Sequence, residues 1–340
     1  MADSTREVRL AARPVGAPQE SDFELAETSI PEPADGEVLV RNAYMSVDPY
    51  MRSRMNETKS YVPSFRIGEP LQGGAVGQVV ASRCEVLAEG DWVNSMYGWR
   101  EHYVANGEHL MRIDPEIAPV STALGVLGMP GLTAYVGLHD IGQPKAGETV
   151  FVSAASGAVG SVVGQLAKLK GCRVVGSAGS AEKVRHLLEE LDFDAAFNYK
   201  EVAVADALGD ACPDGIDIYF ENVGGEHLEC ALARMNLFGR VALCGLISQY
   251  NATEAPRGPA NFPQVLVNRL LLKGFIISDH FDRIPDFLAE VGPLVASGKL
   301  KYRETVIEGI ENAPSAFIGL LSGENFGKML VKLGPGPTEA

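Results

Sequence analysis

From about residue 145 onward, short apolar runs alternate with longer segments in which apolar residues recur at helical spacing. The apolar runs predict strands at 149–153, 173–177, 196–199, 216–221, 240–245 and 274–277. The longer segments predict helices at 159–170, 181–191, 225–233 and 262–271. Strands that alternate with helices are typical of βαβ units, so we expect an α/β fold with a doubly wound parallel sheet of six strands.

The segments on either side of this region have a different pattern. The first part of the chain consists of short β-rich pieces separated by turn signals, with strands predicted at 37–43 and 74–81. After a helix expected at 284–297, residues 305–332 return to strand and loop signals. We therefore predict that the doubly wound domain, residues 126–304, is inserted in a β-rich domain formed by residues 1–125 and 305–340.

Composition and charge narrow the possible partners. The chain has 340 residues, of which 46% are hydrophobic, and a net charge of −15. Nucleic acid and anionic membranes bind positive surfaces, so we expect neither as a partner. The start of the chain lacks the apolar core of a secretory signal, and residues 123–138 are broken by Gly and Pro. With five scattered cysteines and no Cys-x-x-Cys pair, these features predict a cytoplasmic protein.

The strongest motif lies where the first of the six predicted strands runs into a helix. The sequence Thr149-Val-Phe-Val-Ser-Ala-Ala-Ser-Gly-Ala-Val-Gly-Ser161 places small residues at Ala155, Gly157 and Gly160. This is the spacing of the dinucleotide fingerprint, with Ala155 in place of the first glycine. We expect a helix beginning near Ala158, whose first N–H groups face a pyrophosphate. A purely structural strand–turn–helix is the alternative interpretation.

The second predicted strand indicates which nicotinamide cofactor is used. The sequence from Cys172 to Ser180 lacks the acidic residue that would bind the ribose 2′-hydroxyl of NAD. Lys183 follows one turn into the next helix, where a cation suits a 2′-phosphate. NADP is therefore favoured over NAD, although a solvated helix lysine is the alternative interpretation of Lys183.

Several stretches together resemble one family. They are residues 45–52 (MSVDPYMR), 154–165 (AASGAVGSVVGQ), 220–225 (FENVGG), 244–251 (CGLISQYN) and 324–328 (ENFGK). Nearly the whole chain resembles the medium-chain dehydrogenase/reductase superfamily. Within it, the chain is similar to the leukotriene B4 12-hydroxydehydrogenase and prostaglandin reductase group, which includes plant alkenal double-bond reductases and bacterial curcumin reductase. Asn268 stands where some relatives have a tyrosine, so no catalytic role is carried over to it.

The resemblance implies a Rossmann domain inserted in a GroES-like partial barrel, an NADP cofactor and a homodimer. It implies cofactor contacts at Gly157, Ala158, Val159, Gly160, Lys183, Tyr199, Asn222, Cys244, Gly245, Ile247, Ser248, Tyr250, Phe275, Ile276, Ile277 and Asn325. We expect Cys244 to contact the cofactor through its backbone. An edge strand near 275–278 is where we expect two subunits to pair.

The sequence predicts a metal-free site. Zinc alcohol dehydrogenases of this superfamily carry a Gly-His-Glu motif where this chain has Gly68-Glu69-Pro70, and no early cysteine stands within residues 45–52. None of the six histidines forms a ligand spacing with a cysteine. Without a Lewis acid to stabilise an alkoxide, we expect reduction of a C=C bond conjugated to a carbonyl, whose enolate needs only hydrogen-bond donors.

Two tyrosines are the candidate catalytic residues. Tyr250 follows the fifth predicted strand of the sheet, at the edge where ligands bind, and its phenol could donate to the enolate or relay a proton. Tyr50 is the second candidate, expected to line the substrate cleft from the other domain. Packing, with the hydroxyl satisfied by backbone, is the alternative interpretation for both.

The predicted function is therefore zinc-independent, NADPH-dependent reduction of the C=C bond of an α,β-unsaturated ketone or aldehyde. An NADPH quinone oxidoreductase and a non-enzymatic NADPH-binding protein are the alternatives. Residues 56–65 and 251–263 are expected to border the cleft, and their shape decides the substrate.

Overall fold

The computed structural model describes residues 4–337. The outermost residues of the expected first domain, 1–3 and 338–340, lie outside the described part. The chain divides into two compact units, one running to Gly125 and resuming at Glu304, the other Val126–Arg303. Within residues 4–337, no helix has the length and apolarity required to cross a membrane.

The second unit is built on a six-stranded parallel sheet in the order β10-β9-β8-β11-β12-β13. In chain order, the strands are β8 Thr149–Val152, β9 Arg173–Ala178, β10 Ala195–Asn198, β11 Ile216–Glu221, β12 Met235–Leu243 and β13 Leu271–Gly274. The order reverses between β8 and β11, as in a doubly wound sheet. The predicted fold class, an α/β doubly wound sheet with a separate β-rich unit, is confirmed.

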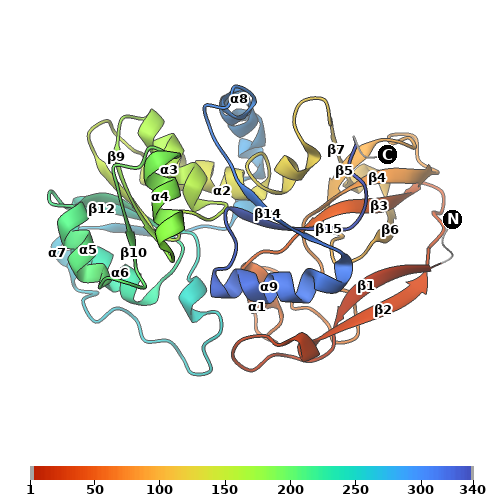
Figure 1. Cartoon of the computed structure of the whole chain (residues 1–340), viewed down its shortest axis with the longest axis horizontal. Helices are drawn as coiled ribbons and strands as arrows, with labels where there is room; N and C mark the ends of the chain where they lie inside the picture. The colour runs from red at the N-terminus through yellow and green to blue at the C-terminus, as the bar shows by residue number, and fades with distance from the viewer. Residues whose placement is uncertain (1–3, 338–340) are drawn as a thin grey trace. The chain divides into compact units, whose positions relative to one another are not determined.

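Helices cover both faces of this sheet (Figure 1). Val150, Val152 and Val174 pack in a core with helices α2, α3, α4 and α8. Phe151 and Tyr219, which point to the other face because side chains alternate along a strand, pack against α5 and α6. The helices of this unit are α2 Met129–Val136, α3 Gly160–Leu169, α4 Ala181–Glu189, α5 Val204–Ala211, α6 Gly225–Leu232, α7 Gln264–Val267 and α8 Ile284–Ala296.

The last strand of the sheet differs from the prediction. The expected strand at 274–277 is wrong, because β13 pairs with β12 through Leu271–Gly274 and a 3₁₀ helix begins at Ile277. The predicted edge strand near 275–278 is wrong for the same reason. The helix expected at 262–271 is also shorter, spanning only Gln264–Val267. Residues 270–277 form one apolar run apart from Lys273 and Gly274. The hydrophobic pattern of such a run does not show which of its residues pair with the neighbouring strand.

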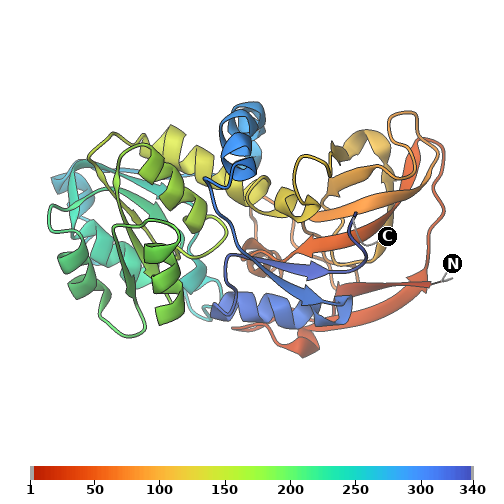
Figure 2. The same cartoon turned by 45° about the horizontal axis from the view of Figure 1, so that its top comes forward.

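The first unit contains strands from both ends of the chain (Figure 2). Its main sheet has the path β14-β15-β3-β4-β5-β7, with β6 also paired to β3, and β1 pairs with β2 in a separate ribbon. β15 pairs with β3, which explains how the C-terminal segment completes a sheet begun near the N-terminus. The strands are β1 Ser4–Leu10, β2 Phe23–Ser29, β3 Glu37–Ser46, β4 Ala75–Ser82, β5 Trp92–Ser95, β6 His102–Asn106, β7 Met111–Ile113, β14 Glu304–Glu308 and β15 Lys328–Lys332.

Among the described residues of this first unit, two α-helices are present. The short helix α1, Tyr50–Arg54, follows β3 directly and starts after Pro49. The helix α9, Ala313–Ser322, lies between β14 and β15, where only strand and loop were expected, so that expectation is wrong. α9 forms because Ala313, Ala316, Phe317 and Leu320 recur at helical spacing and pack in one buried cluster with β15. Gly323, in the left-handed conformation with φ 77°, ends it.

Candidate functional site

Most of the predicted cofactor residues lie at one edge of the parallel sheet, because they follow the carboxyl ends of its strands. The strand order reverses between β8 and β11, and ligands of such sheets bind beside this switch point. Asn325 and Tyr50 belong to the first unit instead. The edge residues are Gly157, Ala158, Val159 and Gly160 after β8, Lys183 after β9, Tyr199 after β10, Asn222 after β11, Cys244, Gly245, Ile247, Ser248 and Tyr250 after β12, and Phe275, Ile276 and Ile277 after β13.

The turn from β8 to α3 has the tight geometry of a phosphate loop. Ala154 lies in the left-handed region with φ 49°, and its carbonyl accepts the Gly157 N–H at 3.0 Å. A Cβ atom on Gly160 would lie 2.6 Å from Ala154 O and 2.8 Å from Ala155 Cα, so only glycine lets the helix pack this closely. α3 begins at Gly160, not near Ala158 as expected, which leaves Ala158 and Val159 in the turn.

A basic patch follows β9 and β10. The Ser180 hydroxyl caps α4 by accepting the Lys183 N–H at 3.3 Å. Burial lowers the pKa of Lys183, and the like charge of Lys200 lowers it further. Tyr199 Oη and Lys200 Cε both approach the backbone of Gly179, lying 3.1 and 3.3 Å from where a Cβ atom would be. Two ammonium groups that repel one another favour an anion beside them, and sequence reasoning missed Lys200 although it adjoins Tyr199.

A buried histidine lies beneath this patch. The ring of His227 meets the edge of the Tyr199 ring with centroids 5.2 Å apart, and His227 Nε2 lies 3.1 Å from Ser177 Oγ. Burial lowers the pKa of His227 to about 4, so the imidazole is neutral near pH 7. His227 therefore packs against Tyr199 as a buried, uncharged neighbour.

The switch point itself is occupied by Glu221, the last residue of β11. This carboxyl group is fully buried, and Ser153 Oγ, at the end of β8, donates to its Oε1 at 3.0 Å. Asn222 Nδ2 in turn donates to the Ser153 carbonyl at 2.8 Å. Burial raises the pKa of Glu221, and the N–H groups of Gly224 and Val223 oppose that rise. Within the FENVGG motif at 220–225, the sequence predicts a cofactor contact only for Asn222, so the role of Glu221 was missed.

The loop after β12 packs on the loop after β11. Ile247 N–H donates to Asn222 O at 3.1 Å, and the Ser248 hydroxyl donates to Val223 O at 2.6 Å. Tyr250 follows the 3₁₀ turn Ile247–Gln249 of this loop, and its phenol oxygen accepts the Leu246 N–H at 3.4 Å. Burial, and secondarily Glu221, raise the pKa of Cys244 to about 12, so its thiol stays protonated near pH 7.

Phe275 faces the protein interior. Its ring meets the edge of the Phe220 ring with centroids 6.4 Å apart, and it packs against the core on one face of the sheet. A Cβ atom on Gly137 would lie 2.8 Å from the Phe275 ring, which shows how tightly the ring is enclosed. Phe275 is nevertheless only partly buried, and it follows β13 at the carboxyl edge of the sheet.

In the first unit, a buried ion pair fixes the turn that leads to Tyr50. Lys328 Nζ lies 3.1 Å from Asp48 Oδ1 and donates to Val47 O at 3.0 Å. The Ser46 hydroxyl bonds the other oxygen of Asp48. Among residues 4–337, the buried Tyr50 hydroxyl has no hydrogen-bond partner. Burial raises the pKa of Tyr50, the Asp48 charge adds to the rise, and the Arg54 guanidinium opposes it.

The side chain of Asn325, the other predicted contact in this unit, forms a hydrogen bond within its own turn. Its side-chain amide donates to Gly327 O at 2.7 Å and is buried. The side chain therefore shapes the turn that leads into β15.

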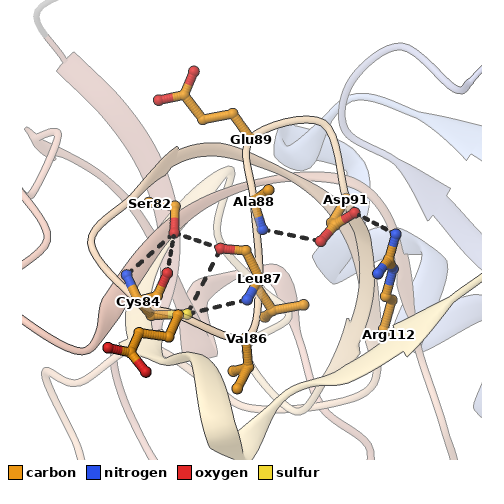
Figure 3. A pocket seen from close by; sticks show the side chains of 9 residues that line it. Ser82, Cys84, Val86, Leu87, Ala88, Glu89, Asp91 and Arg112 are labelled. Atoms are coloured by element: carbon orange, nitrogen blue, oxygen red, sulfur yellow. Dashed lines mark hydrogen bonds and ion pairs between the residues drawn. The ribbon is translucent and has the colours of Figure 1, made fainter.

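A hollow on the first unit contains none of the predicted site residues (Figure 3). It lies over the turn that follows β4, where the Leu87 N–H donates to Cys84 Sγ at 3.3 Å and the Ala88 N–H donates to Asp91 Oδ2 at 2.9 Å. Arg112 pairs with the other Asp91 oxygen at 2.9 Å. These bonds are those of a self-contained turn.

Comparison with known proteins gives two family matches. The family described as the N-terminal domain of oxidoreductase matches residues 6–113, and that described as zinc-binding dehydrogenase matches residues 158–292. NADPH-dependent curcumin reductase of Escherichia coli is 49% identical, with 95% of each chain covered. The NADP(+)-dependent 2-alkenal reductase of Nicotiana tabacum is 47% identical, covering 96% of this chain and 97% of its own.

A solved structure is equally similar. CurA from Vibrio vulnificus, in complex with NADPH, matches with a TM-score of 0.92 at 48% identity. The match covers 97% of this chain and 99% of that chain. The fold described above is therefore also found in a relative of nearly the same length.

The name of the second family includes zinc, but the residues present do not fit a zinc centre. Structural and catalytic zinc sites use three or four side chains of Cys, His, Asp or Glu. Within the described range, 4–337, no group of three or more such side chains is placed to hold a metal ion.

Proposed function

We propose a reaction for this chain on the premise that it belongs to the medium-chain dehydrogenase/reductase superfamily, in the reductase group with curcumin, 2-alkenal and prostaglandin reductases. Like those relatives, it is an NADPH-dependent oxidoreductase. The reaction we propose is reduction of the C=C bond of an α,β-unsaturated ketone or aldehyde. The observation that carries this proposal is the position of the Tyr250 phenol. It lies in the loop after β12, at the carboxyl edge of the sheet, and this loop is hydrogen-bonded to the loop after β11.

The chain's residues fit NADPH. In the β8–α3 turn, Gly160 packs directly on the backbone of Ala154 and Ala155, and this tight turn suits a pyrophosphate bound against backbone N–H groups. Lys183 and Lys200 would hold the 2′-phosphate, with Tyr199 beside them. Asn222, Gly245 and the backbone after β13 are the further contacts we propose. When bound, the reduced nicotinamide supplies hydride to the β-carbon of the substrate, which leaves negative charge on the carbonyl oxygen.

Tyr250 is proposed to stabilise that charge. Its oxygen already accepts the Leu246 N–H, which uses a lone pair of the phenol and polarises the O–H toward donation. A phenol donating to the developing enolate lowers the barrier as an oxyanion-hole donor does. The α-carbon then gains one proton, from Tyr250 or from water relayed through it, and the product is the saturated carbonyl compound. Tyr50 is proposed as a second substrate contact, since its hydroxyl is buried and unpaired within residues 4–337.

We also propose that the protein works as a homodimer through the β13 edge. β13 ends the sheet, so one side of its backbone is left for pairing with another strand. Exposed apolar residues lie on this strand and on its neighbours: Leu271 on β13, Leu237 and Phe238 on β12, and Leu266 on α7. Light scattering of the purified protein tests this, and Leu271→Lys is expected to shift a dimer toward monomer. A monomer in the unsubstituted protein would contradict the proposal.

The cytoplasmic location remains a proposal that the cysteines support. All five are free thiols in the structure, and two of them, Cys172 and Cys212, are buried where oxidation would disrupt packing. Fractionation of the native cells, with the chain detected by antibody, would test the location.

The reaction class is tested by following NADPH oxidation with a linear 2-alkenal, an aryl enone and a simple quinone in parallel, each repeated with NADH. We expect turnover of the alkenal or enone, with NADPH preferred. Turnover of the quinone alone would make the chain an NADPH quinone oxidoreductase. NADPH binding without turnover of any of the three would favour the non-enzymatic interpretation.

A further inference from the structure

Glu221 is a fully buried acidic residue that takes no part in the proposed reaction, and it lies at the switch point of the sheet. Its Oε1 atom accepts three hydrogen bonds, from the Ser153 hydroxyl at 3.0 Å, the Val223 N–H at 2.6 Å and the Gly224 N–H at 2.9 Å. A carboxylate oxygen with three donors is fully coordinated, and such bonds are stronger than those between neutral groups. Removing the acceptor would therefore leave three buried donors unsatisfied.

Two of those donors belong to the beginning of a helix. Gly224 is the residue before α6, and its φ of 76° turns the Val223 and Gly224 N–H groups inward, toward Glu221. The N-terminus of a helix attracts negative charge, and here the protein itself supplies the acceptor oxygen. At the neighbouring turn, from β8 to α3, the acidic side chain is absent and the turn is closed by the small residues at 154–160.

The main chain of Glu221 holds a third loop. Its carbonyl accepts the Cys244 N–H at 2.9 Å and the Gly245 N–H at 3.1 Å. The Ser153 hydroxyl, held by the carboxylate, also accepts the Asn222 N–H at 2.9 Å. Thus one residue connects the segment that enters the phosphate turn, the segment after β11 and the segment after β12.

We infer that Glu221 is a positioning residue: its carboxyl oxygen at the N-terminus of α6 and its main-chain carbonyl together fix the three carboxyl-edge loops in the arrangement that binds NADPH. The inference deepens the proposed function, because it concerns the same cofactor site. Cofactor phosphates are left to the β8–α3 turn, since the donors at α6 are already taken. Glu221 itself does not contact the reacting atoms.

The test uses Glu221→Ala, Glu221→Gln and a matched control, Glu148→Ala. Glu148 lies at the opposite, amino edge of the same sheet, where it pairs with Arg240 at 2.6 Å, so its loss removes a partly buried ion pair from the same unit. The dissociation constant for NADPH is measured by quenching of protein fluorescence, and KM and kcat are measured with the enone. We expect Glu221→Ala to raise the dissociation constant about tenfold to a hundredfold and to change kcat at saturating NADPH much less.

Chemical rescue distinguishes positioning from a general loss of packing. Formate can enter the space left in Glu221→Ala and accept the same three donors, so we expect it to restore at least about a third of the lost affinity at tens of millimolar. Formate should have no effect on Glu148→Ala, whose affinity for NADPH stays within about twofold of the unsubstituted protein. Glu221→Gln keeps an acceptor oxygen and should lose only about threefold to tenfold.

The inference is overturned if folded Glu221→Ala binds NADPH within about twofold of the unsubstituted protein, or if formate acts equally on the control. Should Glu221→Ala not fold, unchanged affinity in Glu221→Gln overturns it. Failure of the proposed function is seen separately, as NADPH binding by the unsubstituted protein without reduction of the enone, and the binding comparison then still decides the role of Glu221.

Discussion

The phenol oxygen of Tyr250 lies 3.4 Å from the backbone nitrogen of Leu246 and accepts its N–H, which anchors the tyrosine to the turn after β12. A Cβ atom on Gly245 would lie 3.2 Å from the same oxygen, so the phenol is held close over the backbone of the loop. Tyr250→Phe removes the hydroxyl and keeps the ring. If the hydroxyl stabilises the enolate, kcat for an enone falls about a hundredfold while KM for NADPH changes little.

Tyr135→Phe is the matched control for that substitution. Tyr135 packs against His139 and Phe287 within the helical layer of the same unit. Its loss of a hydroxyl should leave kcat unchanged within about twofold. Equal losses of kcat in both variants, or none in either, would remove Tyr250 from the proposed mechanism.

Lys183→Ala tests the choice between the two nicotinamide cofactors. Because the 2′-phosphate is present only in NADPH, we expect KM for NADPH to rise about tenfold to a hundredfold and KM for NADH to change little. Lys168→Ala is the control. Lys168 lies on the preceding helix, α3, and forms an ion pair with Asp194 at 2.8 Å. Steady-state kinetics with both cofactors check this, and a parallel rise for NADH would mean that Lys183 acts through stability alone.

Two glycine-to-alanine substitutions are expected to have opposite effects on the free energy of unfolding. In Gly160→Ala the new Cβ would lie 2.6 Å from Ala154 O, so we expect a loss of about 1–3 kcal/mol together with weaker NADPH binding. In Gly292→Ala, inside α8, the new Cβ meets nothing within 4 Å. Alanine is the better helix former, so this variant should gain about 0.5–1 kcal/mol.

Thermal or urea unfolding of both glycine variants measures these changes. The comparison controls for the substitution itself, because each variant adds one methyl group to a helix of the same unit. A tolerated Gly160→Ala with full cofactor affinity would show that the close packing of α3 on the β8–α3 turn is not required.

His227 predicts how stability depends on pH. Burial lowers its pKa in the folded protein from 6.5 to about 4, so the unfolded chain takes up a proton at higher pH than the folded one does. The stability that the neutral imidazole contributes is complete above pH 6.5 and is lost as the pH falls from 6.5 to 4. The loss amounts to about 3 kcal/mol.

Urea unfolding between pH 7.5 and pH 5 checks this slope. In His227→Gln, which keeps a polar atom for Ser177 and does not titrate, the fall in unfolding free energy over that range should be smaller than in the unsubstituted protein. Identical slopes in the two proteins would place the acid sensitivity elsewhere.

The fold class was accessible from the sequence because the strands of a parallel sheet are apolar on both faces. The run Ile216–Glu221 was predicted with the bounds that β11 has. α5 was missed because Gly209 and three small alanines give a weak periodic signal over only eight residues. α9 was missed because Pro314 and Gly319 stand inside it, although Pro314 sits in its first turn, where proline is tolerated.

Only part of the candidate site could be predicted from the sequence. The small residues of the β8–α3 turn and Lys183 follow recognisable strand ends, so their common edge could be predicted. Glu221 could not be, because its role depends on Ser153, Gly224 and Gly245 converging in space from three loops. Lys200 was missed for a similar reason, since its proximity to Lys183 arises from the parallel pairing of β9 with β10.

The most direct test of the account is the fate of isotopic label in one turnover. The protein is incubated with an aryl enone and NADPH deuterated at C4 of the nicotinamide, and separately with unlabelled NADPH in D₂O, and the product is examined by NMR. We predict a saturated ketone with cofactor deuterium at the β-carbon and solvent deuterium at the α-carbon. An allylic alcohol labelled at the carbonyl carbon, or no product while NADPH binds, would contradict it.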